Sequence, residues 1–127
     1  TDAGYLIAAQ RHCLSLLDEN GAIGPKITTA ARSGTIITVT IAHDAGDDFT
    51  PTSNIEGFKF FDDNVEIAIS SAVRSNSTAI TLTLASAPSG TETLYYGYDD
   101  MAGINTANII RDNAAVPMPL RTAKIIL

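Results

Sequence analysis

The chain has 127 residues, of which 45% are hydrophobic and 17% charged, and its net charge is −6. This length fits one domain with a single sizeable core, and the composition excludes the polar, highly charged class of disordered proteins. Only eight residues are Lys or Arg. Because binding to a phosphate backbone depends on clustered basic side chains, we expect no nucleic-acid partner. No apolar run reaches the roughly 18 residues of a membrane-spanning helix, so no membrane partner is expected either.

The first segment has the pattern of an amphipathic α-helix. Thr1 can cap its N-terminus, Asn20-Gly21 can cap its C-terminus, and Gly24-Pro25 prevents continuation. The apolar side chains that recur at three- and four-residue spacing are Leu6, Ala9, Cys13, Leu16 and Leu17. We therefore expect one helix over residues 2–19, whose apolar stripe needs a partner surface.

After Pro25 the hydrophobic period changes from 3.6 to 2, which is typical of β-strands. The clearest alternating segments are residues 35–43, 65–69, 80–84 and 94–98. Shorter strand-like runs are residues 27–31, 58–61, 108–111 and 122–127. Turn-forming residues separate the strands at positions 32–34, 62–64, 75–77 and 88–90. The predicted fold class is mainly β: an N-terminal α-helix followed by an antiparallel β-sandwich, jelly-roll or Ig-like, of about seven or eight strands.

The opening residues Thr1-Asp2-Ala3-Gly4-Tyr5 resemble the block that ends SGNH/GDSL-type hydrolases. In those enzymes a catalytic Asp and His are followed by Thr or Ser, two variable residues, Gly and an aromatic residue, and then by the final helix. The resemblance implies that residues 1–21 are the terminal helix of an upstream SGNH hydrolase domain. It also implies that the catalytic His precedes Thr1.

Short motifs in the rest of the chain follow one order. They are Gly57-Phe58, Ile69-Ser70-Ser71-Ala72, Leu94-Tyr95-Tyr96-Gly97-Tyr98, residues 108–113 and residues 116–121. This order is similar to the C-terminal β-sandwich of sialate O-acetylesterase-like and related carbohydrate-active SGNH proteins, including ones encoded by phages. The resemblance implies that residues 25–127 are such a sandwich and that the parent protein is an SGNH-type ester hydrolase of the O-acetylesterase class. The Ser-bearing block and the Asp-x-x-His block are missing, so this chain alone is not expected to be an enzyme.

The residues themselves also provide no catalytic constellation, and no catalytic residue is assigned. Nucleophilic catalysis needs a Ser or Cys held against an oriented base. His12 and Cys13 are adjacent on the predicted helix and therefore do not face each other. His43 precedes the acidic residues 44–48, but no Ser lies in an elbow motif such as G-x-S-x-G. We interpret His43 and these acidic residues as a solvated loop.

Acidic turns at residues 44–48, 62–64 and 99–100 are the candidates for binding a hard cation. None of them has the spacing of an EF-hand or of an RTX repeat. Acidic residues between strands commonly form turns, so no metal and no other cofactor is expected.

The densest group of aromatic and polar side chains suggests a glycan site. Sugar rings stack on aromatic faces, while carboxylates and amides bind the hydroxyls. The candidate glycan-binding residues are Tyr95, Tyr98, Asp99, Asp100 and Asn105. Alternation along the strand instead favours Tyr96 and Tyr98 as core residues beside Leu94. Tyr95 would then lie on the outer face.

Two functions from different classes follow. The first is a non-catalytic accessory sandwich of a carbohydrate esterase that contributes to glycan binding or domain stability, with the upstream hydrolase domain and a glycan as partners. The second is a structural or receptor-binding oligomerisation module of a phage tail fibre, tailspike or head spike. In a monomer the helix stripe and Ile125-Ile126-Leu127 would be left uncovered, which favours a homo-oligomer or a folded-back helix. Both functions favour an extracellular or virion-associated location.

Overall fold

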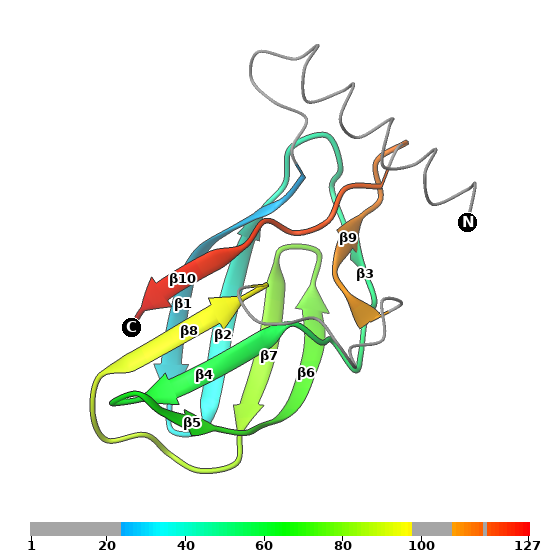
Figure 1. The fold of residues 1–127 in the computed structure, drawn as a ribbon. Coiled ribbons are helices and arrows are strands. Elements are labelled where there is room, and N and C mark those ends of the chain that lie inside the picture. Colours follow the sequence, from blue (N-terminus) through cyan, green and yellow to red (C-terminus); the bar gives the residue numbers. More distant parts are fainter. Residues whose placement is uncertain (1–23, 98–107, 116) are drawn as a thin grey trace, which may run out of the picture.

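The computed structural model describes residues 24–97, 108–115 and 117–127, which form ten β-strands and no α-helix (Figure 1). The prediction of a mainly β fold with antiparallel sheets is confirmed for these residues. The predicted helix over residues 2–19 lies outside them. So do four of the candidate glycan-binding residues, which are Tyr98, Asp99, Asp100 and Asn105.

The first four-stranded sheet has the order β1-β2-β7-β6, and every pair is antiparallel. Its strands are β1 (Lys26–Ser33), β2 (Ile36–Ala42), β7 (Ala79–Leu84) and β6 (Ile69–Asn76). Strict alternation gives β2 and β7 their two faces, because successive side chains of a strand point to opposite sides. The residues that this alternation buries are Ile37, Val39, Ile41, Ile80, Leu82 and Leu84.

The second four-stranded sheet has the order β10-β8-β4-β5 and is also antiparallel. Its strands are β10 (Ala123–Ile126), β8 (Glu92–Tyr96), β4 (Phe58–Asp62) and β5 (Val65–Ile67). Two further short strands, β3 (Phe49–Thr50) and β9 (Arg111–Asp112), pair with each other. The predicted number of seven or eight strands is therefore too low, because β3 is too short to produce a periodic pattern and because one predicted strand is in fact two.

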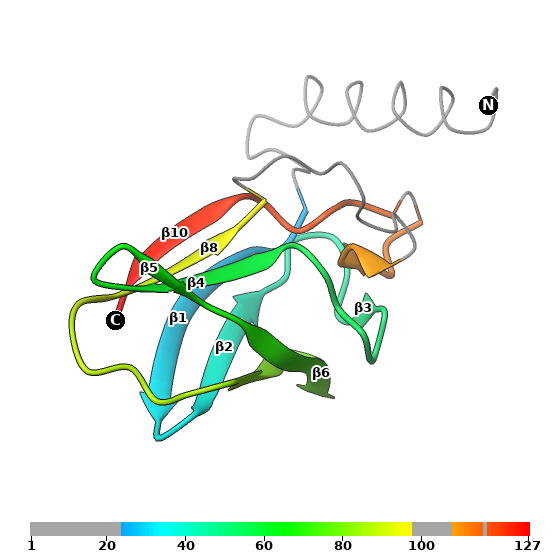
Figure 2. The ribbon, with the colours of Figure 1, turned by 60° about the horizontal axis from the view of Figure 1, so that its bottom comes forward.

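The predicted strand over residues 65–69 is two strands in two different sheets. β5 pairs with β4, whereas β6 begins at Ile69 and pairs with β7, so the chain changes sheet at Ala68. Figure 2 shows this passage from β5 into β6. The alternation at Val65, Ile67 and Ile69 continues through the break, because periodicity records which side chains are apolar and not which strand the backbone pairs with.

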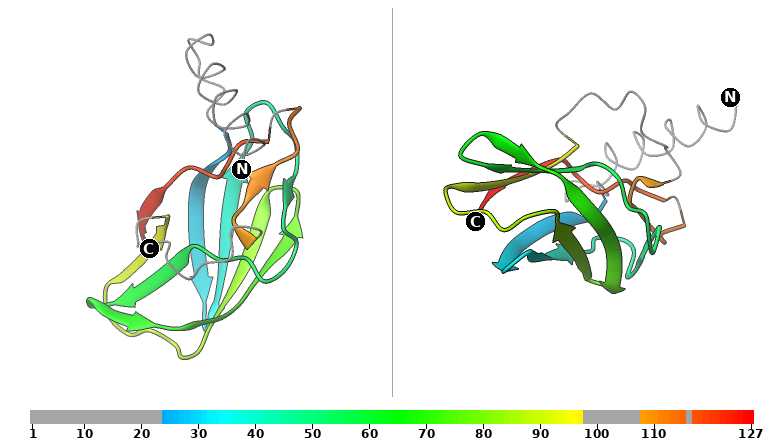
Figure 3. Two further views of the ribbon diagram at one scale, coloured as in Figure 1. Left: turned by 45° about the vertical axis from the view of Figure 1, so that its right-hand side comes forward. Right: turned by 90° about the horizontal axis from the view of Figure 1, so that it is seen from below.

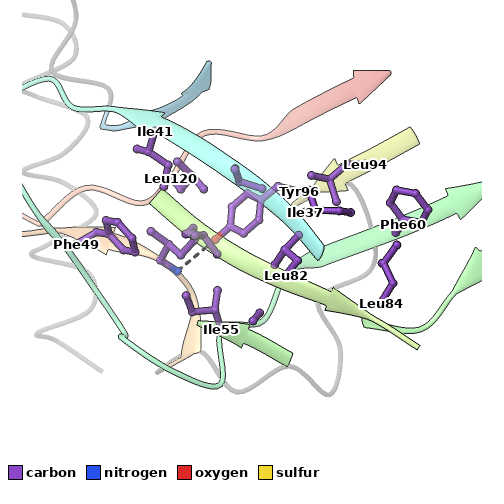
Figure 4. Close-up of a cluster of buried hydrophobic side chains, with 14 residues drawn as sticks. Ile37, Ile41, Phe49, Ile55, Phe60, Leu82, Leu84, Leu94, Tyr96 and Leu120 are labelled. Atoms are coloured by element: carbon purple, nitrogen blue, oxygen red, sulfur yellow. Dashed lines mark hydrogen bonds between the residues drawn. The ribbon is translucent and has the colours of Figure 1, made fainter. Parts of the chain in front are cut away.

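The two large sheets share one buried core (Figure 4). Phe60, Leu94 and Tyr96 of the second sheet belong to the same cluster as the buried residues of β2 and β7. The right-hand view of Figure 3 shows the ribbons of the two sheets facing each other. On one flank β1 contacts β10, and an ion pair between Arg32 and Glu92 joins the sheets there. The opposite flank, where β4 approaches β6, contains the pocket described below.

Tyr96 connects this core to the segment that follows residue 107. Its hydroxyl accepts a hydrogen bond from the backbone N–H of Ile110 at 3.2 Å, drawn as the dashed line in Figure 4. Its ring lies 4.8 Å from that of Phe58, measured between centroids. Gly57 approaches the same ring so closely that a Cβ atom there would lie 2.8 Å from Cε2 of Tyr96. Burial raises the pKa of the Tyr96 hydroxyl to about 12.

Replacing Tyr96 by Phe tests this connection. At neutral pH, Tyr96→Phe leaves the buried N–H of Ile110 without its acceptor, so we expect the free energy of unfolding to fall by about 1–2 kcal/mol. The raised pKa means that the unfolded chain releases the Tyr96 proton near pH 10, while the folded chain keeps it until about pH 12. The native protein should therefore lose stability between pH 10 and 12, and the variant should lose less.

Urea unfolding of both proteins at pH 8 and pH 11 measures these effects. The difference in the free energy of unfolding between native protein and variant should be smaller at pH 11. An equal difference at both pH values would contradict a buried, hydrogen-bonded Tyr96 hydroxyl.

Candidate functional site

A pocket of about 440 Å³ lies between the two large sheets on the flank of β4 and β6. Its lining consists of residues 54–58, residues 69–72 and Asn108. The first segment leads into β4, the second is the beginning of β6, and Asn108 comes just before β9. Three parts of the chain that are distant in sequence thus meet at one cavity.

Backbone hydrogen bonds fix the segment 54–58 on both sides. Ile55 donates its N–H to the carbonyl of Ala72 at 3.1 Å, and Glu56 donates to the carbonyl of Asn108 at 3.0 Å. The carbonyl of Gly57 accepts a hydrogen bond from Gly97, also at 3.0 Å. Gly57 has a φ of +108°, which L-residues with a side chain rarely adopt. The glycine therefore allows the chain to turn from the pocket into β4 directly against the Tyr96 ring.

The polar part of the pocket centres on Glu56 and Asn108. The side-chain amide of Asn108 donates a hydrogen bond to Oε2 of Glu56 at 3.0 Å, and both residues are half-buried. Both residues line the pocket, so a carboxylate and an amide that are held by this hydrogen bond border the cavity.

The rest of the pocket combines apolar and hydroxyl groups. Phe58 and Ile69 are half-buried, and Ile55 and Ala72 are buried beneath the cavity. Ser70 donates its hydroxyl hydrogen bond to the carbonyl of Thr83 at 3.1 Å. An apolar wall with a few oriented polar groups is the usual composition of a small-ligand site.

The described lining residues offer hydrogen-bonding groups beside apolar ones. Glu56 is the one carboxylate among the lining residues, which contain no His and no Cys. Glycoside hydrolysis usually uses two carboxylates, and acyl transfer uses a nucleophile activated by a base. What these groups can do is accept and donate hydrogen bonds to a ligand that also has an apolar face.

Tyr95, the described member of the candidate glycan-binding set, does not line this pocket. It lies on the outer face of β8, while its neighbours Leu94 and Tyr96 are buried in the core. Alternation predicted this placement of the three residues, and the structure confirms it. The pocket residues Glu56 and Asn108 were not predicted, because no local pattern indicates that residues 52 positions apart form a hydrogen bond.

The interpretation of residues 43–48 as a solvated loop is wrong for His43, whereas the Asp48 side chain is 40% exposed, as that interpretation expects. His43 is half-buried, its Nε2 lies 2.5 Å from the carbonyl oxygen of Ser77, and its ring stacks on Phe49 at 6.2 Å between centroids. Asp48 forms two hydrogen bonds of 2.9 Å with Arg74, which hold the pKa of its carboxyl below the ordinary value. These residues fasten the loop to the first sheet.

Asn113 holds the same loop from the other side, next to the buried Asp112. Asp112 is only 3% exposed and orders the segment that follows it, because its Oδ1 accepts the backbone N–H of Met118 at 2.8 Å. The Asn113 side-chain oxygen accepts the N–H groups of Asp47 and Asp48 at 2.9 and 3.1 Å. The polar groups that surround the loop are therefore mostly used for packing it against β9.

Within residues 24–97, 108–115 and 117–127, no three His, Cys, Asp or Glu side chains gather as a metal site would require. In the same part of the chain, no helix has the length and apolar character to cross a membrane. No protein-family model, curated protein or solved structure matches the chain.

Proposed function

We propose that this chain is a non-catalytic glycan-binding β-domain whose pocket at Glu56 and Asn108 holds one sugar unit. The hydrogen-bonded pair of these two side chains, beside the apolar wall at Phe58, is the observation that carries the proposal. A sugar ring has an apolar face and an edge of hydroxyl groups. A carboxylate with an adjacent amide can bind neighbouring hydroxyls, while an aromatic or aliphatic wall contacts the ring.

The assignment of the fold as a β-sandwich is part of the same proposal. Two four-stranded antiparallel sheets that contribute to one core support a β-sandwich of the jelly-roll or Ig-like kind. In this proposal residues 25–127 are the accessory sandwich of an SGNH-type carbohydrate esterase, and the upstream hydrolase domain supplies the ester-cleaving residues. The pocket would hold a glycan near that domain, in an extracellular or virion-associated protein.

Sugar binding is tested with the full 127-residue chain and four neutral probes: glucose, galactose, mannose and N-acetylglucosamine. We expect at least one of them to bind in isothermal titration calorimetry, and Glu56→Gln to weaken that binding about tenfold. The reason is that a hydrogen bond to a charged group contributes more than one to a neutral amide. Asn108→Ala should weaken binding as well, since it removes the group that orients Glu56.

Asp44→Asn serves as the matched control, because it removes one acidic charge at an exposed position outside the pocket. It should leave the sugar affinity unchanged. The proposal fails if none of the four sugars binds, or if Asp44→Asn weakens binding as much as Glu56→Gln does.

A second candidate function is self-association through the outer face of β1-β2-β7-β6, as in an oligomeric fibre or spike module. Its outward positions on β2 and β7 carry Ile, Thr and Ala and no charge, and Ile36 and Val73 are 39% and 36% exposed. Two copies of a chain with a net charge of −6 can approach each other most easily through an uncharged face.

Light scattering on the native chain and on Thr81→Lys tests this second candidate. Thr81 lies opposite Thr38 in the middle of the face, so a lysine there should convert an oligomer into a monomer. A native chain that is already monomeric at millimolar concentration would exclude this function.

A further inference from the structure

The outer face of the second sheet carries an aromatic residue between two lysines. Tyr95 on β8 lies opposite Lys59 on β4 and opposite Lys124 on β10, so the three form one row across three neighbouring strands. Residues that pair in this way point to the same face. Tyr95 is half-buried on the side away from the core, and Lys124 is exposed.

Contacts within the row and beside it hold the Tyr95 ring in place. The Lys124 Nζ atom lies 5.8 Å from the centroid of the ring, within the range of a cation–π contact. The ring of Phe61 meets it edge-on, with the centroids 5.5 Å apart and the planes at 89°. An aromatic ring that is fixed by its neighbours loses little entropy when a ligand covers it, which favours binding.

The local charge differs in sign from that of the whole chain. The net charge is −6, yet the outward positions of β4, β5, β8 and β10 carry two lysines and one carboxylate, Glu66. Glu66 lies 3.9 Å from Lys59, and both side chains are at least 40% exposed. Such a solvent-exposed pair contributes little free energy.

From this arrangement we infer that the outer face of β10-β8-β4 binds an acidic polysaccharide, with a sugar ring on Tyr95 and sugar carboxylates at Lys59 and Lys124. The inference rests on the proposed glycan-binding function and adds the charge class of the ligand. Neighbouring strands are about 4.8 Å apart, so the two lysine positions lie about 10 Å apart on either side of the ring. This spacing favours an extended chain with repeated carboxylates over a single small anion.

Polygalacturonate and its fully methyl-esterified form are the probes, because they share one sugar backbone and differ in charge. We expect the 127-residue chain to bind polygalacturonate in low-salt buffer at least tenfold more tightly than the ester. The affinity for polygalacturonate should fall as salt is added, because salt screens exposed charges. Equal affinity for the two polymers would overturn the inference.

Variants of the row identify the surface. Lys59→Gln with Lys124→Gln should lower the affinity for polygalacturonate about tenfold, whereas replacing both lysines by Arg should preserve it. Lys26→Gln is the matched control, since Lys26 is an exposed lysine on the other sheet. The melting temperature of each variant is measured first, and it should equal that of the native chain. A loss of binding in Lys26→Gln as large as in the double variant would contradict the inference.

Glu56→Gln separates this inference from the proposed pocket. The substitution should weaken binding of a neutral sugar and leave binding of polygalacturonate unchanged. If the neutral sugars fail to bind but polygalacturonate binds through the lysines, the pocket proposal is wrong and the inference about the outer face of β10-β8-β4 stands. If both lysines can be replaced by Gln without effect while Glu56→Gln still weakens sugar binding, the inference about the outer face is wrong and the pocket proposal stands.

Discussion

The pocket depends on the contacts of one buried side chain, that of Tyr96. Its hydroxyl holds the backbone of Ile110, and its ring packs against Phe58 and leaves room only for a glycine at position 57. Glu56 and Asn108, the two residues that form the polar part of the pocket, are therefore one and two positions from residues that Tyr96 fixes. A polar group buried in the core, satisfied by one hydrogen bond, in this way sets the geometry of a site at the surface.

The two proposed ligand surfaces differ in character and share strand β4. The pocket presents a carboxylate and an amide, which suit the hydroxyl groups of a neutral sugar, whereas the outer face presents two lysines around an aromatic ring, which suit acidic sugars. β4 contributes to both: Phe58 lines the pocket and Lys59 lies on the outer face, because neighbouring residues of a strand point to opposite sides. A polysaccharide with both neutral and acidic units could contact the domain on both sides of this strand.

The sequence predicts the fold well where alternation is strict, as in β2 and β7, whose buried and exposed residues follow from the pattern alone. It also predicts the tight turn between β4 and β5, where Asp63 and Asn64 both have positive φ values. It fails at Ala68, because a change of sheet leaves the apolar pattern intact. It fails again at the Glu56–Asn108 pair and at the Asp48–Arg74 pair, since both join residues from separate elements and only the folded chain brings them together.

A heteronuclear NMR titration of the 15N-labelled chain with the four neutral sugars tests the proposed pocket most directly. A sugar in the pocket should change the chemical shifts of the amides of residues 54–58 and 70–72 and of the side-chain amide of Asn108. These residues line one pocket although they are far apart in sequence, so joint changes would locate the ligand there. Shift changes that leave Glu56 and Asn108 unaffected would contradict the pocket proposal, because the sugar would then bind elsewhere.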